Sequence, residues 1–236
     1  MAYPEDLVGK YIRWNRTGTA LSAEEKKSDE YVLTGHSANL SVPVFNYFAG
    51  SPGKPGARGA PSVPPRPANF INLTPWNISF LDYFPGKVTA VQSQSPVLTG
   101  PMSGCYLFRY QDQSSTWYAH VGTAETEEVS VQAKTKWKIF AETSRMATNI
   151  WGQSPLRFFD DQTLASAGLL AGGPPHIFGL FQPGQDGNKG FYAVLLARIK
   201  SGAPEHGYVK VCAVKESYLQ RWDVIKKTDA FKDIRT

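Results

Sequence analysis

Two short runs of strand-forming residues, joined by a polar turn, constrain the fold of this chain most. Cys105–Tyr110 and Trp117–Val121 are rich in aromatic and aliphatic residues that favour β-strands. The residues between them, 111–116, are all polar, as expected of a turn. The pattern predicts a β-hairpin, and with it a sheet that contains antiparallel strands.

Several other segments carry strand patterns. Residues 87–92, 128–132 and 136–140 are strand-like, the last because its apolar and charged residues alternate with period two. The longest apolar run, 190–199, predicts a central strand, and 208–214 pairs with it in a second predicted hairpin. We therefore expect a β-rich α+β fold with mostly antiparallel strands.

Helices are few in this pattern. Residues 161–170 predict one, capped by Asp160 or Asp161 and ended by the glycine–proline run 172–175. Residues 217–222 predict the start of another. The helices are thus expected to flank the sheet structure rather than to build it.

A glycine- and proline-rich run interrupts the chain early. Residues 50–67 contain three basic side chains and no acidic one, and such a composition predicts a mobile surface loop. The length of 236 residues suits one large domain. We therefore expect a single domain over residues 1–236 that carries this loop.

One cysteine and one histidine stand on the two arms of the first hairpin. If the chain reverses within the turn, Cys105 lies opposite a residue between His120 and Gly122. Opposed side chains have Cβ atoms about 5 Å apart and diagonal ones about 7 Å, so an imidazole reaches the sulfur at either spacing. A register slip of one residue would put the two on opposite faces. A thiol beside an imidazolium, which lowers the pKa of the thiol, is the minimum for nucleophilic attack on a carbonyl.

The residues before the cysteine suit the same chemistry. Ser103 and Gly104 allow a close approach of the backbone to a bound group, because glycine has no Cβ. The amides of Gly104 and Cys105 would then hold the oxygen of the attacked carbonyl, as an oxyanion hole requires. Thr99 supplies a hydroxyl that orients either His120 or the substrate. The alternative is an inert cysteine buried on a strand.

This segment resembles the catalytic core of the cytotoxic necrotizing factor toxins and of Burkholderia lethal factor. The residues that carry the resemblance are Ser103, Gly104, Cys105, His120, Gly122 and Thr123. Met102 stands where leucine is usual, and Thr99 matches the threonine position of the similar chemotaxis receptor deamidases. The resemblance covers residues 97–123. It implies a β-sandwich core with flanking helices, and deamidation of protein glutamines by Cys105 and His120 with support from Thr99.

The resemblance also implies a biological role, that of a bacterial toxin or effector acting on a host protein such as a GTPase or a translation factor. The first residues, 1–6, lack the basic and apolar regions of a signal peptide. We therefore expect secretion without a cleavable signal and action in the host cytoplasm, or else a place in the bacterial cytoplasm. Transglutamination and proteolysis remain open within the same chemistry. A non-catalytic β-rich binding protein with a buried Cys105 remains open outside it.

Composition and charge limit the kinds of ligand and partner that we expect for this chain. The net charge of +5 is modest, and no basic stripe with interleaved aromatic residues indicates nucleic-acid binding. No apolar run approaches the roughly 18 residues of a membrane-spanning helix.

The two cysteines, Cys105 and Cys212, are expected to be reduced. No histidine pair has the spacing of a metal site, so we expect no metal. We also expect no cofactor, and a monomer.

Overall fold

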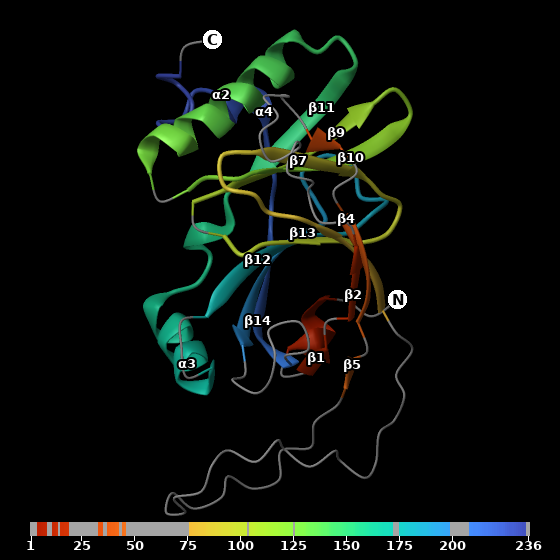
Figure 1. Ribbon diagram of the computed structural model, residues 1–236, viewed down its shortest axis with the longest axis vertical. Coiled ribbons are helices and arrows are strands. Elements are labelled where there is room, and N and C mark those ends of the chain that lie inside the picture. The colour runs from red at the N-terminus through yellow and green to blue at the C-terminus, as the bar shows by residue number, and fades with distance from the viewer. Residues whose placement is uncertain are drawn as a thin grey trace, which may run out of the picture.

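The described part of the chain forms two β-sheets that face each other across a shared apolar layer (Figure 1). The computed structural model describes residues 4–8, 11–13, 15–18, 33–34, 37–42, 44–45, 76–102, 104–124, 126–171, 175–198 and 208–234. The glycine- and proline-rich run 50–67 lies outside these residues. Among the described residues, no helix combines the length and the apolar composition needed to cross a membrane.

The larger sheet has nine strands in the order β2-β4-β6-β8-β12-β13-β14-β1-β5. Its strands are β1 Tyr11–Arg13, β2 Asn15–Gly18, β4 Ser37–Val42, β5 Val44–Phe45, β6 Trp76–Leu81, β8 Val97–Thr99, β12 His176–Phe181, β13 Phe191–Arg198 and β14 Tyr208–Ser217. Neighbours are antiparallel except β6 and β8. The long apolar run is β13, paired with β12 on one side and β14 on the other, which confirms the predicted central strand and its hairpin.

The smaller sheet has six strands in the order β15-β11-β9-β10-β7-β3. Its strands are β3 Leu33–Thr34, β7 Val88–Gln92, β9 Tyr106–Asp112, β10 Ser115–Val121, β11 Ala147–Gln153 and β15 Gln220–Arg221. Neighbours are antiparallel except β3 and β7. The predicted first hairpin is confirmed, because β9 and β10 pair from Asp112 opposite Ser115 to Tyr106 opposite Val121.

Apolar side chains fill three layers around the two sheets. The layer between the sheets, here called the inter-sheet core, takes residues from both of them: Leu81, Val97, Phe181 and Leu195 from the larger sheet, and Val91, Leu107 and Tyr118 from the smaller one. A second cluster covers the outer face of the larger sheet, and a third covers the outer face of the smaller sheet. The fold is therefore a β-rich α+β sandwich with mostly antiparallel strands, as predicted.

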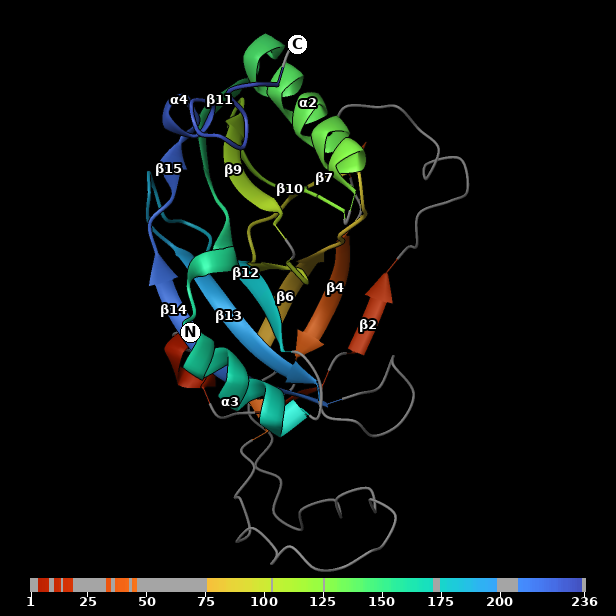
Figure 2. The same ribbon diagram turned by 90° about the vertical axis from the view of Figure 1, so that its left-hand side faces the viewer.

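Helices cover the sandwich at its periphery (Figures 1 and 2). The helical segments are η1 Pro4–Leu7, α2 Glu127–Thr143, η2 Pro155–Arg157, α3 Asp161–Ala171 and α4 Trp222–Ile225. α2 lies on the outer face of the smaller sheet, where Trp137 stacks on Phe108 with ring centroids 4.2 Å apart. The predicted helix at 161–170 is confirmed as α3, and Asp160 caps it by accepting a 2.7 Å hydrogen bond from the Thr163 amide.

Two local predictions are wrong. Residues 128–132 and 136–140 are not strands but belong to α2. The five-residue window at 136–140 alternates, yet the buried side chains Ala133 and Trp137 are four residues apart, which is helical spacing. A helix does start within 217–222, as predicted, but at the last of these residues, Trp222, because β14 runs to Ser217 and β15 follows.

Candidate active site

Cys105 lies directly before the first residue of β9 and is completely buried. In the hairpin, Tyr106 pairs with Val121 and Leu107 with His120. Continuing this register by one residue sets Cys105 opposite Gly122, within the range that the sequence predicts. His120 is thus the diagonal neighbour of Cys105, a position for which Cβ atoms are about 7 Å apart.

The same register puts Cys105 and His120 on one face of the smaller sheet. Cys105, Leu107 and, on β10, Tyr118 belong to the inter-sheet core. Along the chain, Cys105 and Leu107 alternate with residues that belong to the cluster on the outer face of the smaller sheet. His120 is two residues beyond Tyr118, so its side chain also points between the sheets, and it is completely buried. The arrangement with both groups on opposite faces, which the sequence left open, does not occur.

Thr99 reaches His120 from the other sheet. It ends β8, is completely buried, and its hydroxyl oxygen lies 2.6 Å from Nδ1 of His120. The same hydroxyl donates a 2.8 Å hydrogen bond to the Leu81 carbonyl. Because a hydroxyl carries one proton, Thr99 must accept from His120, so Nδ1 carries the ring hydrogen. Nε2 then has a free lone pair.

The imidazole of His120 is neutral. Its Nε2 is buried and has no hydrogen-bond partner among the described residues. Burial lowers the pKa of the His120 imidazole to about 3, because a charged ring is poorly solvated there. This corrects the expectation of an imidazolium beside the thiol. In this structure the ring is neutral, its Nε2 lone pair is free, and no hydrogen bond joins Nε2 to the thiol of Cys105.

Two residues that the sequence analysis gave no role complete the surroundings of the pair. The Thr123 hydroxyl oxygen lies 3.5 Å from Sγ of Cys105. Tyr83 donates a 2.5 Å hydrogen bond to the Thr123 carbonyl, and its ring centroid lies 5.2 Å from that of His120. Thr123 is near enough in sequence to be noticed as part of the resemblance, whereas nothing local in the sequence marks Tyr83.

The backbone before Cys105 has the conformation expected of a glycine position. Gly104 has φ +96°, a value that residues with a Cβ rarely adopt, and it is half-buried. Ser103 lies outside the described residues. An oxyanion hole formed by the amides of Gly104 and Cys105 stays a prediction.

Gly122, opposite Cys105, occupies a site with no room for a side chain. Its amide donates a 2.9 Å hydrogen bond to the Lys87 carbonyl, its own carbonyl accepts one from Gly86, and an added Cβ would overlap the Phe84 carbonyl oxygen. We expect Gly122→Ala to lower the free energy of unfolding by about 1–3 kcal/mol, measured by urea denaturation. An unchanged unfolding midpoint would contradict the tight packing described here.

Removal of the Thr99 hydroxyl tests whether its hydrogen bond to His120 stabilises the fold and fixes the tautomer of the ring. We expect Thr99→Val, which keeps the shape, to lower the free energy of unfolding by about 1–3 kcal/mol, because it leaves the His120 Nδ1–H and the Leu81 carbonyl unpaired. Urea denaturation measures this loss, and ¹⁵N NMR of the ring measures the tautomer. Thr99→Ser keeps the hydroxyl and is the matched control. Equal stability of the valine and serine variants would rule out the hydrogen bond as a contributor.

The fold and these side chains define a class of protein: a β-rich α+β sandwich with a cysteine, a histidine and a threonine buried between its sheets. No family model and no curated protein matches this sequence. Among solved structures, the chain is similar to the C-terminal domain of CNFy from Yersinia pseudotuberculosis, with 8% sequence identity and a TM-score of 0.24. The match covers 61% of this chain and 65% of that domain. This similarity is weak and says nothing about the chemistry of the site.

Proposed function

We propose that this chain is a cysteine-dependent protein-glutamine deamidase. One observation carries the proposal: the Thr99 hydroxyl fixes His120 in the tautomer whose free Nε2 lone pair lies on the same sheet face as Cys105. A nucleophilic cysteine needs a neighbouring base, and the base needs a third group to orient it. We assign these three roles to Cys105, His120 and Thr99, respectively.

The reaction follows from these roles. Nε2 of His120 takes the thiol proton, and Sγ attacks the carboxamide carbon of a glutamine side chain. The tetrahedral intermediate then expels ammonia, which leaves with the proton from His120, and a thioester forms. Water, deprotonated by His120, hydrolyses the thioester to glutamate and frees the thiol. An amine in place of water would give transglutamination, and a peptide bond in place of the side-chain amide would give proteolysis.

The biological part of the proposal comes from the resemblance of residues 97–123 to the glutamine deamidase toxins. We propose a toxin or effector that modifies a host protein, such as a GTPase or a translation factor, in the host cytoplasm. Neither nucleic acid nor membrane is needed as a partner.

Complete burial of Cys105 favours a second candidate, a non-catalytic binding protein. The thiol is 0% exposed and packs in the inter-sheet core, where a free cysteine is often simply a small apolar side chain. A deamidase must open to admit a glutamine. Pro101 is exposed and Gly104, the residue directly before the thiol, is half-buried, so Gly104 is the nearer of the two to a route for a substrate.

The test of the proposed function uses purified protein and eukaryotic cell lysate. Mass spectrometry then searches for glutamines converted to glutamate. Cys105→Ser is the inactive control, and Cys212→Ser, which removes the other free cysteine, is the matched active control. We expect conversion at one defined glutamine that disappears only with Cys105→Ser. No conversion, together with a Cys105 that reacts with alkylating agents only after unfolding, would favour the binding protein.

A further inference from the structure

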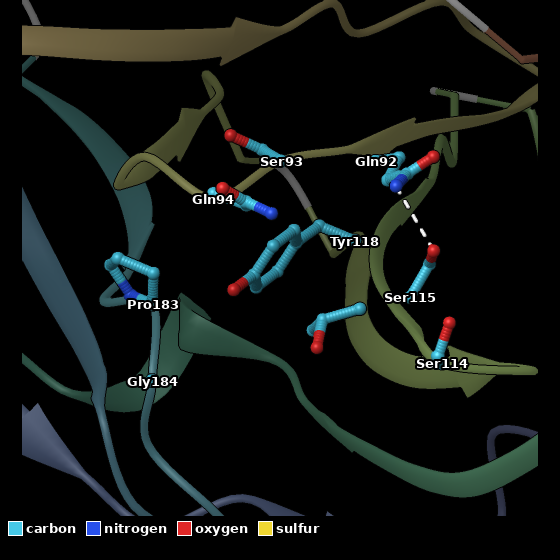
Figure 3. A pocket seen from close by; sticks show the side chains of 9 residues that line it. Gln92, Ser93, Gln94, Ser114, Ser115, Tyr118, Pro183 and Gly184 are labelled. Carbon is cyan, nitrogen blue, oxygen red and sulfur yellow. Dashed lines mark hydrogen bonds between the residues drawn. The ribbon is translucent and has the colours of Figure 1, made fainter.

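A cavity of about 420 Å³ opens at the turn of the β9–β10 hairpin, away from the strand end that carries Cys105. Three segments form its walls: the end of β7, the hairpin turn, and the loop between β12 and β13 (Figure 3). The residues that line it are Gln92, Ser93, Gln94, Ser114, Ser115, Thr116, Tyr118, Pro183 and Gly184. Its volume lies within the roughly 300–1,000 Å³ that is usual for ligand sites.

The residues that line this cavity are mostly polar but carry no charge. It offers carboxamides and hydroxyls, groups that both donate and accept hydrogen bonds. A phosphate, a carboxylate or an ammonium group would find no ion pair among these residues. The lining also presents more apolar than polar surface, to which the ring of Pro183 contributes. This mixture suits a ligand that presents several hydroxyls together with C–H groups.

Tyr118 contributes a hydroxyl to the lining of the cavity. Its side chain is otherwise enclosed, because the residue is only 1% exposed. Figure 3 shows this hydroxyl directed into the space between Gln94 and Pro183. Burial raises the pKa of the Tyr118 phenol, so the group stays protonated and can donate. A ligand atom in the cavity would accept a hydrogen bond from this hydroxyl.

The walls are held in place before any ligand binds. Gln92 donates a 3.0 Å hydrogen bond to Ser115, which ties the end of β7 to the hairpin turn. The buried guanidinium of Arg109 donates to the carbonyls of Gly187 and Lys189, which anchors the loop that carries the third wall. A rigid site loses little freedom on binding.

An extended peptide fits this site less well than a compact ligand. Peptides that add to a sheet need a free strand edge, but β10 is paired with β9 on one side and β7 on the other along the cavity. The cavity therefore offers side-chain groups rather than a row of backbone groups.

We propose that this cavity is a binding site for a neutral polyhydroxylated ligand, namely a mono- or disaccharide. The Tyr118 hydroxyl bonds to a sugar hydroxyl, and the carboxamides and hydroxyls of the walls bond to its neighbours. The proposal does not depend on the chemistry of Cys105.

The test is saturation-transfer NMR on the full chain with glucose, galactose, N-acetylglucosamine, maltose and lactose at millimolar concentration. Glucuronate and glucose 6-phosphate are the charged comparisons, and tetraglycine is the peptide comparison. We expect at least one neutral sugar to bind. Its Kd is expected to rise about tenfold in Tyr118→Phe, which removes a single hydrogen bond. The matched control is Tyr110→Phe, because Tyr110 is a buried tyrosine of the same hairpin on its outer face.

Gln94→Glu provides a second, independent variant. Gln94 is exposed, so the change leaves the core intact while it adds a negative charge to the wall. We expect weaker sugar binding from it as well. Absence of binding by all five neutral sugars would overturn the proposal. So would binding that Tyr118→Phe leaves unchanged, or equal binding of the charged sugars or of tetraglycine.

Discussion

Replacing His120 with alanine is expected to slow alkylation of Cys105 by iodoacetamide near neutral pH and to lower the deamidation rate about 10²–10⁴-fold, the usual contribution of a general base. The reason is that Nε2 of His120 supplies the unpaired lone pair on the sheet face of the thiol. The measurement is the labelling rate of each cysteine by mass spectrometry. Cys105 is expected to react faster than Cys212 in the unchanged protein.

Two further variants serve as controls for the labelling experiment with His120→Ala. His120→Asn is a smaller polar replacement that covers the case in which the alanine variant does not fold. His176→Ala changes a histidine at the start of β12 and should leave the labelling rate unchanged. Equal labelling of Cys105 with and without His120 would contradict the proposed base, and labelling only in denaturant would identify Cys105 as a structural residue.

The hairpin and the central strand could be predicted because their signals are local. Alternating strand formers on both sides of a polar turn specify β9 and β10, and a long apolar run specifies β13. The helix α2 could not be predicted from short windows. Its helical period shows only in the four-residue spacing of the buried side chains Ala133 and Trp137. These two side chains are buried because they pack on the outer face of the smaller sheet, whose strands come from other parts of the chain.

The candidate site, like the fold, could be predicted only where its signals are local in the sequence. The spacing of Cys105 and His120 in one hairpin places them together if the register is right, and only the register in the fold decides their common face. Thr99 lies in the other sheet, so its bond to His120 depends on how the two sheets pack. The neutral state of the imidazole depends on burial. No local sequence pattern encodes burial of this kind.

Acid is expected to destabilise the protein through His120. The folded state holds the ring with a pKa lowered to about 3 by burial, whereas the unfolded chain holds it near 6.5. Between these values the unfolded state binds the extra proton. The free energy of unfolding therefore falls as pH decreases from about 6.5 toward 3, by at most about 1.4 kcal/mol per pH unit from this one group. Above pH 6.5 the ring is neutral in both states and contributes no slope.

Urea denaturation at pH 7, 6 and 5 of the unchanged protein and of His120→Asn measures this slope. The variant is expected to be less stable at pH 7, because it loses the contacts of the ring, but the difference in unfolding free energy should shrink as the pH falls. Most carboxyl groups stay ionised in this range, so the difference between the two proteins isolates the histidine. Parallel stability curves from pH 7 to 5 would mean that water reaches His120 in the folded state. The candidate site would then be open to solvent rather than sealed between the sheets.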